Sequence, residues 1–198
     1  MFEKLVVATG NLHKFKEISA RLKETPTEAI SLRSKGVSLE RPEAGENYFE
    51  NAKIKADEAF EKLQLPALAD DSGLEVDALG GAPGIYSDRW VGTDADASMR
   101  NKKLLEKLEG RPVVRRGARY ICEMVVVDKT GLKYHTRGIC EGRIAQSPRG
   151  GSGFGYDPIF EVEAAAWETF GELSDQVKSR ISHRAIALNK LLSQLRKS

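Results

Sequence analysis

The sequence predicts one α/β domain over residues 1–198, with a central mixed β-sheet flanked by helices. Near the start, the apolar run Leu5–Ala8 leads through a glycine turn into an amphipathic helix, as in a parallel β-α unit. Later, apolar residues alternate on both sides of an Asp128–Gly131 turn, which is typical of an antiparallel hairpin. Together the two patterns indicate a mixed sheet, and 198 residues can bury a substantial core.

The overall charge excludes several classes of function. Lysine and arginine number 31 and aspartate and glutamate 29, for a formal charge of +2. This balance, with no basic stripe, argues against a nucleic-acid-binding protein. No apolar run approaches the ~20 residues of a membrane span, and the start Met1–Lys4 lacks the pattern of a secretion signal. We therefore expect no membrane partner and a cytoplasmic location. Cys122 and Cys140 lack metal-ligand spacing. We interpret them as buried, unoxidised thiols, although a hairpin could bring them near each other.

The first predicted strand runs into Thr9-Gly10-Asn11, and the following helix places Phe15, Ile18 and Leu22 on one face. The N-terminus of a helix after such a turn presents backbone N–H groups to an anion, and Lys14 adds a cation. The stretch lacks the spacing of a Walker loop. It predicts either a phosphate site or a turn with an N-cap.

A second strand is predicted at residues 27–32, followed by a polar connection and a long helix. The helix begins after Asn47, a plausible N-cap with Glu50 at the capping-box position. Its apolar stripe consists of Phe49, Ala52, Ala56, Ala59, Phe60 and Leu63. Glu43 lies in the loop before this helix, where a carboxylate is either solvated or turned toward a site.

Asp70 and Asp71 follow the short apolar run 66–69 and precede Ser72-Gly73. The pattern predicts a buried strand that ends in a loop at the two acids. Adjacent carboxylates in such a place repel each other and lose hydration, which is unfavourable without a nearby cation. A hard divalent metal such as Mg²⁺ suits them. For the pair alone, a solvated acidic loop is the alternative.

The remaining chain contains two glycine-rich loops and three more predicted helices. The loops are residues 80–84 and 150–158, and the second holds Phe154 and Tyr156, which either meet a flat ligand or pack into the core. Helices are predicted at residues 94–108 and 172–180 and at the C-terminus, where a leucine stripe follows His183-Arg184. Two donor-rich side chains at a helix N-terminus indicate an anionic or acceptor-rich ligand.

Several of these stretches, in this order, closely resemble the inosine/xanthosine triphosphate pyrophosphatase family. They are Thr9–Lys14, Glu50–Ala52, Ala69–Leu74, Gly80–Ile85, Gly153–Phe160 and Ser182–Arg184. The similarity extends from Leu5 to the final helix. It implies a two-lobed domain with the active site in the cleft between the lobes, and a homodimer. It also implies hydrolysis of noncanonical purine nucleoside triphosphates (ITP, dITP, XTP) to the monophosphate and pyrophosphate, which keeps them out of DNA and RNA.

The resemblance also implies a role for each matching residue. Asp71 matches the proton acceptor that activates water, and Glu43, Asp70 and Asp71 match the acidic positions around Mg²⁺. Of the acids in the loop before the long helix, Glu40 is the other candidate and Glu43 fits the spacing better. The positions that match substrate contacts are Thr9, Gly10, Asn11, Leu12, His13, Lys14, Lys53, Ser72, Phe154, Gly155, Tyr156, Asp157, Lys178, His183 and Arg184.

Within that set, the resemblance implies three kinds of contact. Thr9–Lys14 and Lys53 would hold phosphates, Phe154 would stack on the base, and His183 and Arg184 would recognise the 6-oxo group of the purine. Two rival hypotheses are a pyrophosphatase with another base preference and a catalytically silent nucleotide-binding module. The loop around Phe154 argues against the first and the acids Glu43, Asp70 and Asp71 against the second.

Overall fold

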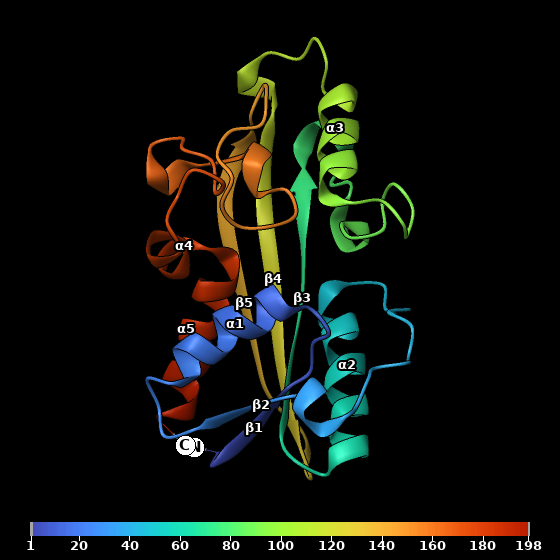
Figure 1. Cartoon of the computed structure of the whole chain (residues 1–198), viewed down its shortest axis with the longest axis vertical. Helices are drawn as coiled ribbons and strands as arrows, with labels where there is room; N and C mark the ends of the chain where they lie inside the picture. The colour runs from blue at the N-terminus through green and yellow to red at the C-terminus, as the bar shows by residue number, and fades with distance from the viewer. Residues whose placement is uncertain (1, 198) are drawn as a thin grey trace. The chain divides into compact units, whose positions relative to one another are not determined.

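The computed structural model describes residues 2–197, which form two compact units (Figure 1). The first unit contains residues up to Asp71, 122–138 and those from Ala185 on, and the second contains residues 72–121 and 139–184. The strands are β1 (Lys4–Val7), β2 (Glu28–Ser31), β3 (Ala67–Val76), β4 (Gly117–Asp128), β5 (Gly131–Ile144) and β6 (Phe160–Val162). The helices are α1 (Leu12–Leu22), α2 (Tyr48–Leu63), α3 (Ala97–Lys107), α4 (Asp175–Ile181) and α5 (His183–Leu195). Within the described residues, no helix has the length and apolarity needed to cross a membrane.

The six strands form one sheet in the order β2-β1-β3-β4-β5-β6. Strand β1 pairs in parallel with β2 and β3, whereas β5 pairs antiparallel with β6. Strands β4 and β5 are neighbours joined by a two-residue turn, as in a hairpin. The predicted α/β class with a mixed sheet is confirmed.

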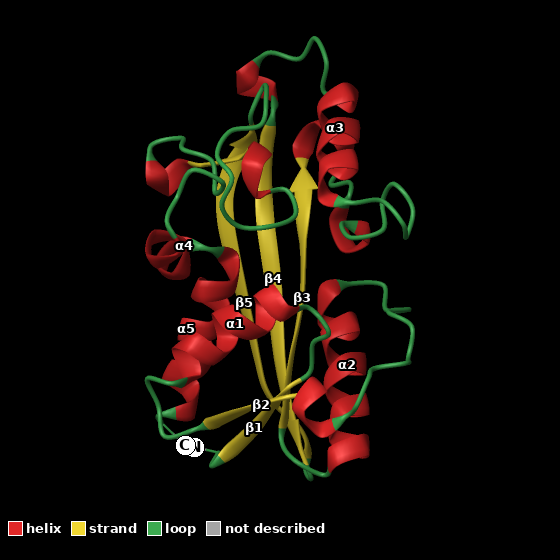
Figure 2. Cartoon of the chain, in the orientation of Figure 1, coloured by secondary structure: helices red, strands yellow, loops and turns green. Residues whose placement is uncertain are grey.

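In the first unit, helices pack on both faces of the strands, and alternate strand residues belong to different core clusters. Figure 2 shows these helices, α1, α2 and α5, around the lower strands. Leu5, Val7 and Leu68 belong to the core cluster that contains α1 and α5. Val6 and Ala8 belong to the cluster that contains α2. Because side chains alternate across a strand, an uninterrupted apolar run such as Leu5–Ala8 can bury both faces of the sheet.

The second unit has one core, in which α3 and the ends of several strands surround a group of aromatic rings. The rings of Tyr120 and Phe160 meet edge to face at 4.8 Å between centroids, and Phe170 lies 5.4 Å from Phe160. Aromatic pairs of this kind contribute beyond the area they bury. They give a rigid base to the second glycine-rich loop, which directly precedes Phe160.

The predicted loop at Asp70-Asp71 is wrong, because both residues lie inside strand β3. This strand pairs with β1 at Ala67 and Leu68, and β4 is its neighbour on the other side, so the strand continues through the acidic pair after the pairing with β1 has ended. Asp70 and Asp71 are 1% and 5% exposed. Cationic and polar side chains, rather than solvent, compensate their charges, as described below.

N-caps place the starts of two helices where the sequence indicates and of two others slightly later. Asn11 and Asn47 are the N-caps of α1 and α2, and each accepts hydrogen bonds from backbone N–H groups of the first turn. The predicted start of a helix at residue 94 is too early, because Asp96 caps α3 by accepting from the N–H of Met99. Helix α4 likewise begins after its N-cap Ser174 instead of at residue 172.

Both cysteines are buried thiols, as expected from their number and spacing. Burial raises the pKa of the Cys140 thiol to about 12, with a smaller contribution from Glu141. Such a thiol is a poor nucleophile at neutral pH.

Candidate active site

The acidic residues predicted around a metal form a cluster with two lysines in the first unit. Asp70 and Asp71 come from β3, Glu43 from the loop before α2, Lys14 from α1 and Lys55 from α2. The structure therefore brings Glu43 to Asp71. The alternative acid, Glu40, has a 77% exposed side chain and lies 3.5 Å from Lys62 instead.

Lys55 joins two of the acids. Its Nζ donates to Glu43 Oε1 at 2.8 Å and to Asp71 Oδ1 at 3.0 Å, and its side chain is 12% exposed. Burial lowers the pKa of Lys55, but the carboxylates of Asp71, Glu43 and Asp70 raise it more, so the net shift is upward. Lys55 is therefore a fixed positive charge at neutral pH.

Asp71 is held at both carboxylate oxygens. Lys55 donates to Oδ1, and the Nδ2 of Asn51, a fully buried residue on α2, lies 3.3 Å from Oδ2. Burial raises the pKa of Asp71 above its usual range, although Lys55 and Lys14 oppose the shift. A carboxylate with a raised pKa is a stronger base, which suits a group that accepts a proton from water.

Asn51 also fixes the loop that carries Glu43. Its Oδ1 accepts from the backbone N–H of Gly45 at 2.9 Å. A Cβ atom on Gly45 would lie 2.6 Å from the Cβ of Glu50, so only glycine allows the loop to approach the helix this closely. One buried amide thus orients both Asp71 and the loop of Glu43.

Asp70 faces a different set of partners. Lys14 Nζ lies 3.2 Å from Asp70 Oδ2, and the thiol of Cys122 lies 3.9 Å from the same oxygen. Lys14 is 8% exposed, so this is a largely desolvated ion pair. Removing either member of such a pair leaves an uncompensated buried charge.

The predicted phosphate loop, Thr9–Lys14, has the geometry of a capped helix start. Thr9 Oγ1 accepts from the N–H of Asn11, and Asn11 Oδ1 accepts from the N–H groups of His13 and Lys14. The cap therefore occupies the backbone N–H groups of His13 and Lys14, which the sequence alone would leave available to an anion. A Cβ on Gly10 would meet no atom within 4 Å, so the backbone there borders open space. The phosphate role of this loop, including Leu12, stays a prediction.

The donor set of the acidic cluster suits a hard cation. Glu43, Asp70 and Asp71 offer only carboxylate oxygens, which are the ligands that Mg²⁺ prefers. Glu43 and Asp71 already converge on one positive group, the ammonium of Lys55. Among the described residues, no three acid, histidine or cysteine side chains are grouped closely enough to form a ready metal site. In this structure, the ammonium of Lys55 lies between Glu43 and Asp71.

Lys53, which the resemblance implied near the phosphates, lies outside this cluster. Its Nζ donates to Asp57 Oδ2 at 2.6 Å on the same helix. The α2 lysine in the cluster is Lys55, which the sequence motifs did not indicate. A signal was present, because Asn51 and Lys55 are four residues apart and share one face of α2, whereas Lys53 and Asp57 share another.

The residues predicted to recognise the base lie together in the second unit. Asp157 Oδ2 accepts from the backbone N–H of Phe154 at 2.7 Å and from Lys178 Nζ at 2.6 Å. Lys178 Nζ lies 4.5 Å from the centroid of the Phe154 ring. Asp157 thus positions both an aromatic face and a cation, which together suit a flat, electron-rich ligand.

The two aromatic side chains of this loop, Tyr156 and Phe154, differ in burial. Tyr156 is 3% exposed and its hydroxyl donates to the carbonyl of Ser87 at 2.9 Å, so its side chain belongs to the core. Phe154 is only half-buried and carries Lys178 on its ring. The structure therefore leaves Phe154 as the ring that a base could meet, with Gly155 between the two.

His183 and Arg184 begin helix α5, as predicted. The His183 ring stacks on Tyr120, with 4.5 Å between centroids and 7° between planes. Arg184 Nη2 donates to Ser72 Oγ at 2.9 Å, and its guanidinium carbon lies 5.9 Å from the Phe154 ring centroid. The structure thus brings Ser72, Arg184 and Phe154 together in one unit.

Comparisons with known proteins agree with this pattern of residues. The model of the Ham1 family matches residues 5–194. A dITP/XTP pyrophosphatase of Yersinia pseudotuberculosis is 44% identical over 98% of both chains. One of Rhodopirellula baltica is 43% identical over 98% of this chain and 93% of its own.

Solved structures agree as well. A HAM1 protein from Coxiella burnetii has a TM-score of 0.89 at 38% identity, with both chains covered completely. The Ham1 protein of Staphylococcus aureus has a TM-score of 0.87 at 34% identity over 98% of each chain. With a family model over nearly its whole length and relatives above 40% identity, the chain belongs to the Ham1 family.

Proposed function

We propose that residues 1–198 act as one pyrophosphatase domain that hydrolyses dITP, ITP and XTP to the monophosphate and pyrophosphate. The observation that carries the proposal is the buried cluster of Asp71 with Lys55, Glu43 and Asn51. Relatives that share over 40% of its residues are named dITP/XTP pyrophosphatases. Such an activity removes noncanonical purines before a polymerase can use them.

In the proposed reaction, Asp71 accepts a proton from the water that attacks phosphorus. Asn51 on α2 holds one of its carboxylate oxygens and so fixes its orientation, whether Lys55 pairs with Asp71 or contacts a phosphate. Lys14 and Lys55 offset the negative charge of the phosphates and of the transition state. Their pairing with acids keeps both lysines in place before the substrate arrives.

Glu43, Asp70 and Asp71 would hold Mg²⁺. A bound Mg²⁺ neutralises phosphate charge and lowers the pKa of a ligated water. Lys55, which pairs with Glu43 and Asp71 here, would then be available to contact a phosphate. Lys53 stays a candidate for a more distant phosphate contact.

Base selection would rest on the second unit. Phe154 supplies a stacking face, and Asp157 fixes its backbone and Lys178. Donors from His183 and Arg184 would pair with a 6-oxo group and be left unpaired by the amino group of adenine. A buried polar group without a partner costs about 1–3 kcal/mol, or roughly ten- to two-hundredfold in specificity.

Two further features belong to the proposal. The enzyme would act as a homodimer, as the family resemblance implies, and in the cytoplasm. Its partners would be the nucleotide and a second copy of the chain, without nucleic acid or membrane.

A pyrophosphate-release assay over dITP, XTP, dUTP, GTP and ATP, with and without Mg²⁺, tests this proposal. We expect rapid release from dITP and XTP that requires Mg²⁺, and at least tenfold lower kcat/KM for ATP and dUTP. Comparable rates on dUTP would favour a pyrophosphatase with another base preference. Release from none of the five would favour a silent binding module.

A further inference from the structure

The second glycine-rich loop is closed at a narrow neck. The N–H of Arg149 donates to the carbonyl of Pro158 at 2.8 Å, so residues 150–157 form a loop of their own between these two positions. This segment, which we call the base loop, carries Phe154 and Asp157. The position of the base loop therefore sets the position of the Phe154 ring.

Little packing supports the base loop along its side toward α3. A cavity of about 1100 Å³ lies there, lined by residues 150–155 on one wall and by Ser98, Asn101 and Leu105 of α3 on the other. One hydrogen bond, from Asn101 Nδ2 to the carbonyl of Gly155 at 3.2 Å, crosses to the helix. Tyr156 and Asp157 anchor the end of the base loop, through Ser87 and Lys178, so the neck is the second place at which the loop is held.

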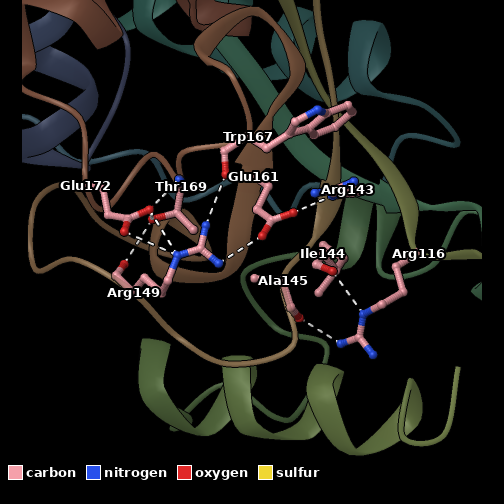
Figure 3. Close-up of polar contacts among 9 residues, drawn as sticks. All are labelled: Arg116, Arg143, Ile144, Ala145, Arg149, Glu161, Trp167, Thr169 and Glu172. Carbon is pink, nitrogen blue, oxygen red and sulfur yellow. Dashed lines mark hydrogen bonds and ion pairs between the residues drawn. The ribbon is translucent and has the colours of Figure 1, made fainter. Parts of the chain in front are cut away.

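The side chain of Arg149 ties that neck to strand β6 and to the segment after it (Figure 3). Its Nη1 donates to Glu161 Oε1 at 2.8 Å, its Nη2 to the carbonyl of Trp167 at 3.0 Å, and its Nε to Glu172 at 3.1 Å. All three nitrogens of the guanidinium are used. The planar fork of arginine matches this arrangement, whereas lysine offers one point charge.

The backbone of Arg149 is tied to the same segment. Thr169 Oγ1 donates to the carbonyl of Arg149 at 3.0 Å, and Glu172 in turn accepts from the N–H of Thr169 at 2.8 Å. A Cβ on Gly171 would lie 2.6 Å from the carbonyl oxygen of Arg149, so the two chains are in direct contact. The base loop itself joins in, because the N–H of Ser152 donates to Gly171 and the N–H of Gly171 to Asp157.

We infer that Arg149 is a positioning residue for base recognition: it holds the neck of the base loop against residues 161–172 and so sets the place of Phe154 and Asp157. Arg149 itself does not touch the substrate in this account. The inference rests on the proposed function, because it takes the loop to be the part that meets the purine. It assigns the Arg149–Glu172 pair a role in substrate affinity as well as in stability.

The chain offers a matched control in Arg143. This residue also pairs with Glu161, and its guanidinium lies 4.0 Å from the Trp167 ring centroid, but it comes from strand β5 rather than from the neck (Figure 3). Arg143→Ala and Arg149→Ala therefore each remove one partner of Glu161. Only the second releases the base loop.

Two probes separate base binding from phosphate binding in calorimetric titrations. Inosine monophosphate carries the base, whereas inorganic pyrophosphate lacks it. We expect Arg149→Ala to weaken the binding of inosine monophosphate about tenfold and that of pyrophosphate less than twofold, because only base contacts depend on the loop. With dITP, KM should rise by a similar factor while kcat stays within about twofold. Arg143→Ala should change neither affinity by more than twofold.

Several outcomes would overturn the inference. Equal losses of affinity in the two arginine variants, or equal losses for both probes in Arg149→Ala, would make Arg149 a structural residue only. If Arg149→Ala does not fold, Arg149→Lys keeps the charge without the fork and should give an intermediate loss for inosine monophosphate alone. A wild-type protein that neither binds inosine monophosphate nor cleaves dITP would instead refute the proposed function, independently of Arg149.

Discussion

At the scale of single residues, the proposed chemistry depends on Asp71 and on the two side chains that contact its carboxylate. One lysine and one amide, both from α2, reach its two oxygens, and burial strengthens it as a base. Asp71→Asn keeps the size of the side chain and removes the base. We expect pyrophosphate release from dITP to fall by at least a hundredfold.

The control for this variant is its fold and its affinity for nucleotide. Circular dichroism should be unchanged, and inosine monophosphate should still bind, because its proposed base contacts lie in the second unit. Turnover within tenfold of the wild type would exclude Asp71 as the proton acceptor.

Lys55 and Lys53 form a second test at this scale, since they are two residues apart on one helix. Lys55 pairs with Asp71 and Glu43, whereas Lys53 pairs with Asp57. Lys55→Met should lower kcat/KM for dITP by about a hundredfold, because a positive charge is lost where negative charge develops. Lys53→Met should cost less than about threefold, since its ion pair is surface-exposed. Steady-state kinetics of both variants decide between the two lysines, and the reverse order would contradict the structure.

The same residues show how far a sequence can be read. Asn47 and Asn11 identify helix starts because capping is a local interaction, and the structure confirms both. Spacing alone places Lys55 on the face of Asn51, but the structure was needed to show that this face of α2, and not that of Lys53, meets β3. Arg149 gave no signal at all, because its partners lie 12 to 23 residues away and no periodicity marks them.

At the scale of elements, apolar patterns predict most strands and helices but misjudge β3. Two adjacent acids normally end a buried strand, since a charge without a partner is costly to bury. In this protein Lys14 and Lys55 reach Asp70 and Asp71 from two different helices, so the strand continues. That compensation is a long-range property, and the local sequence around the acids does not contain it.

The stability contributed by Glu161 on β6, which pairs with Arg143 of β5 and with Arg149, is expected to depend on pH. Burial raises the pKa of Glu161, but hydrogen bonds from Arg143 and Arg149 lower it more, so the net shift is downward. A group with a lowered pKa stabilises the fold fully above its unfolded pKa, about 4.3 for glutamate. This contribution is lost as the pH falls through the lower pKa of the folded state.

Thermal melts between pH 7 and pH 3 test this expectation. Glu161→Gln should have a lower Tm than the wild type at pH 7, and the difference should shrink as the pH falls below about 4. A difference that stays constant over the whole range would show that the charge of Glu161 does not stabilise the fold.

At the scale of the whole molecule, the two compact units carry different parts of the proposed reaction. The first holds the acids and lysines that suit phosphate chemistry, and the second holds Phe154, Asp157 and Arg184, which suit a purine. Strand β3 passes from Asp71 in one unit to Ser72 in the other. Sequence motifs predicted the three acids, Lys14 and the residues named in the second unit, since each motif is short and local. Their partners in space, Asn51, Lys55 and Arg149, required the structure.

This division predicts that base preference can be changed without removing the chemistry. The most direct measurement is the ratio of kcat/KM for dITP to kcat/KM for dATP, taken from pyrophosphate release by the wild type and by Arg184→Ala. We expect a wild-type ratio of at least about ten, which falls toward one in the variant because dITP loses a donor that dATP never used. A wild-type ratio near one, or an Arg184→Ala variant that loses equal activity on both nucleotides, would contradict the account.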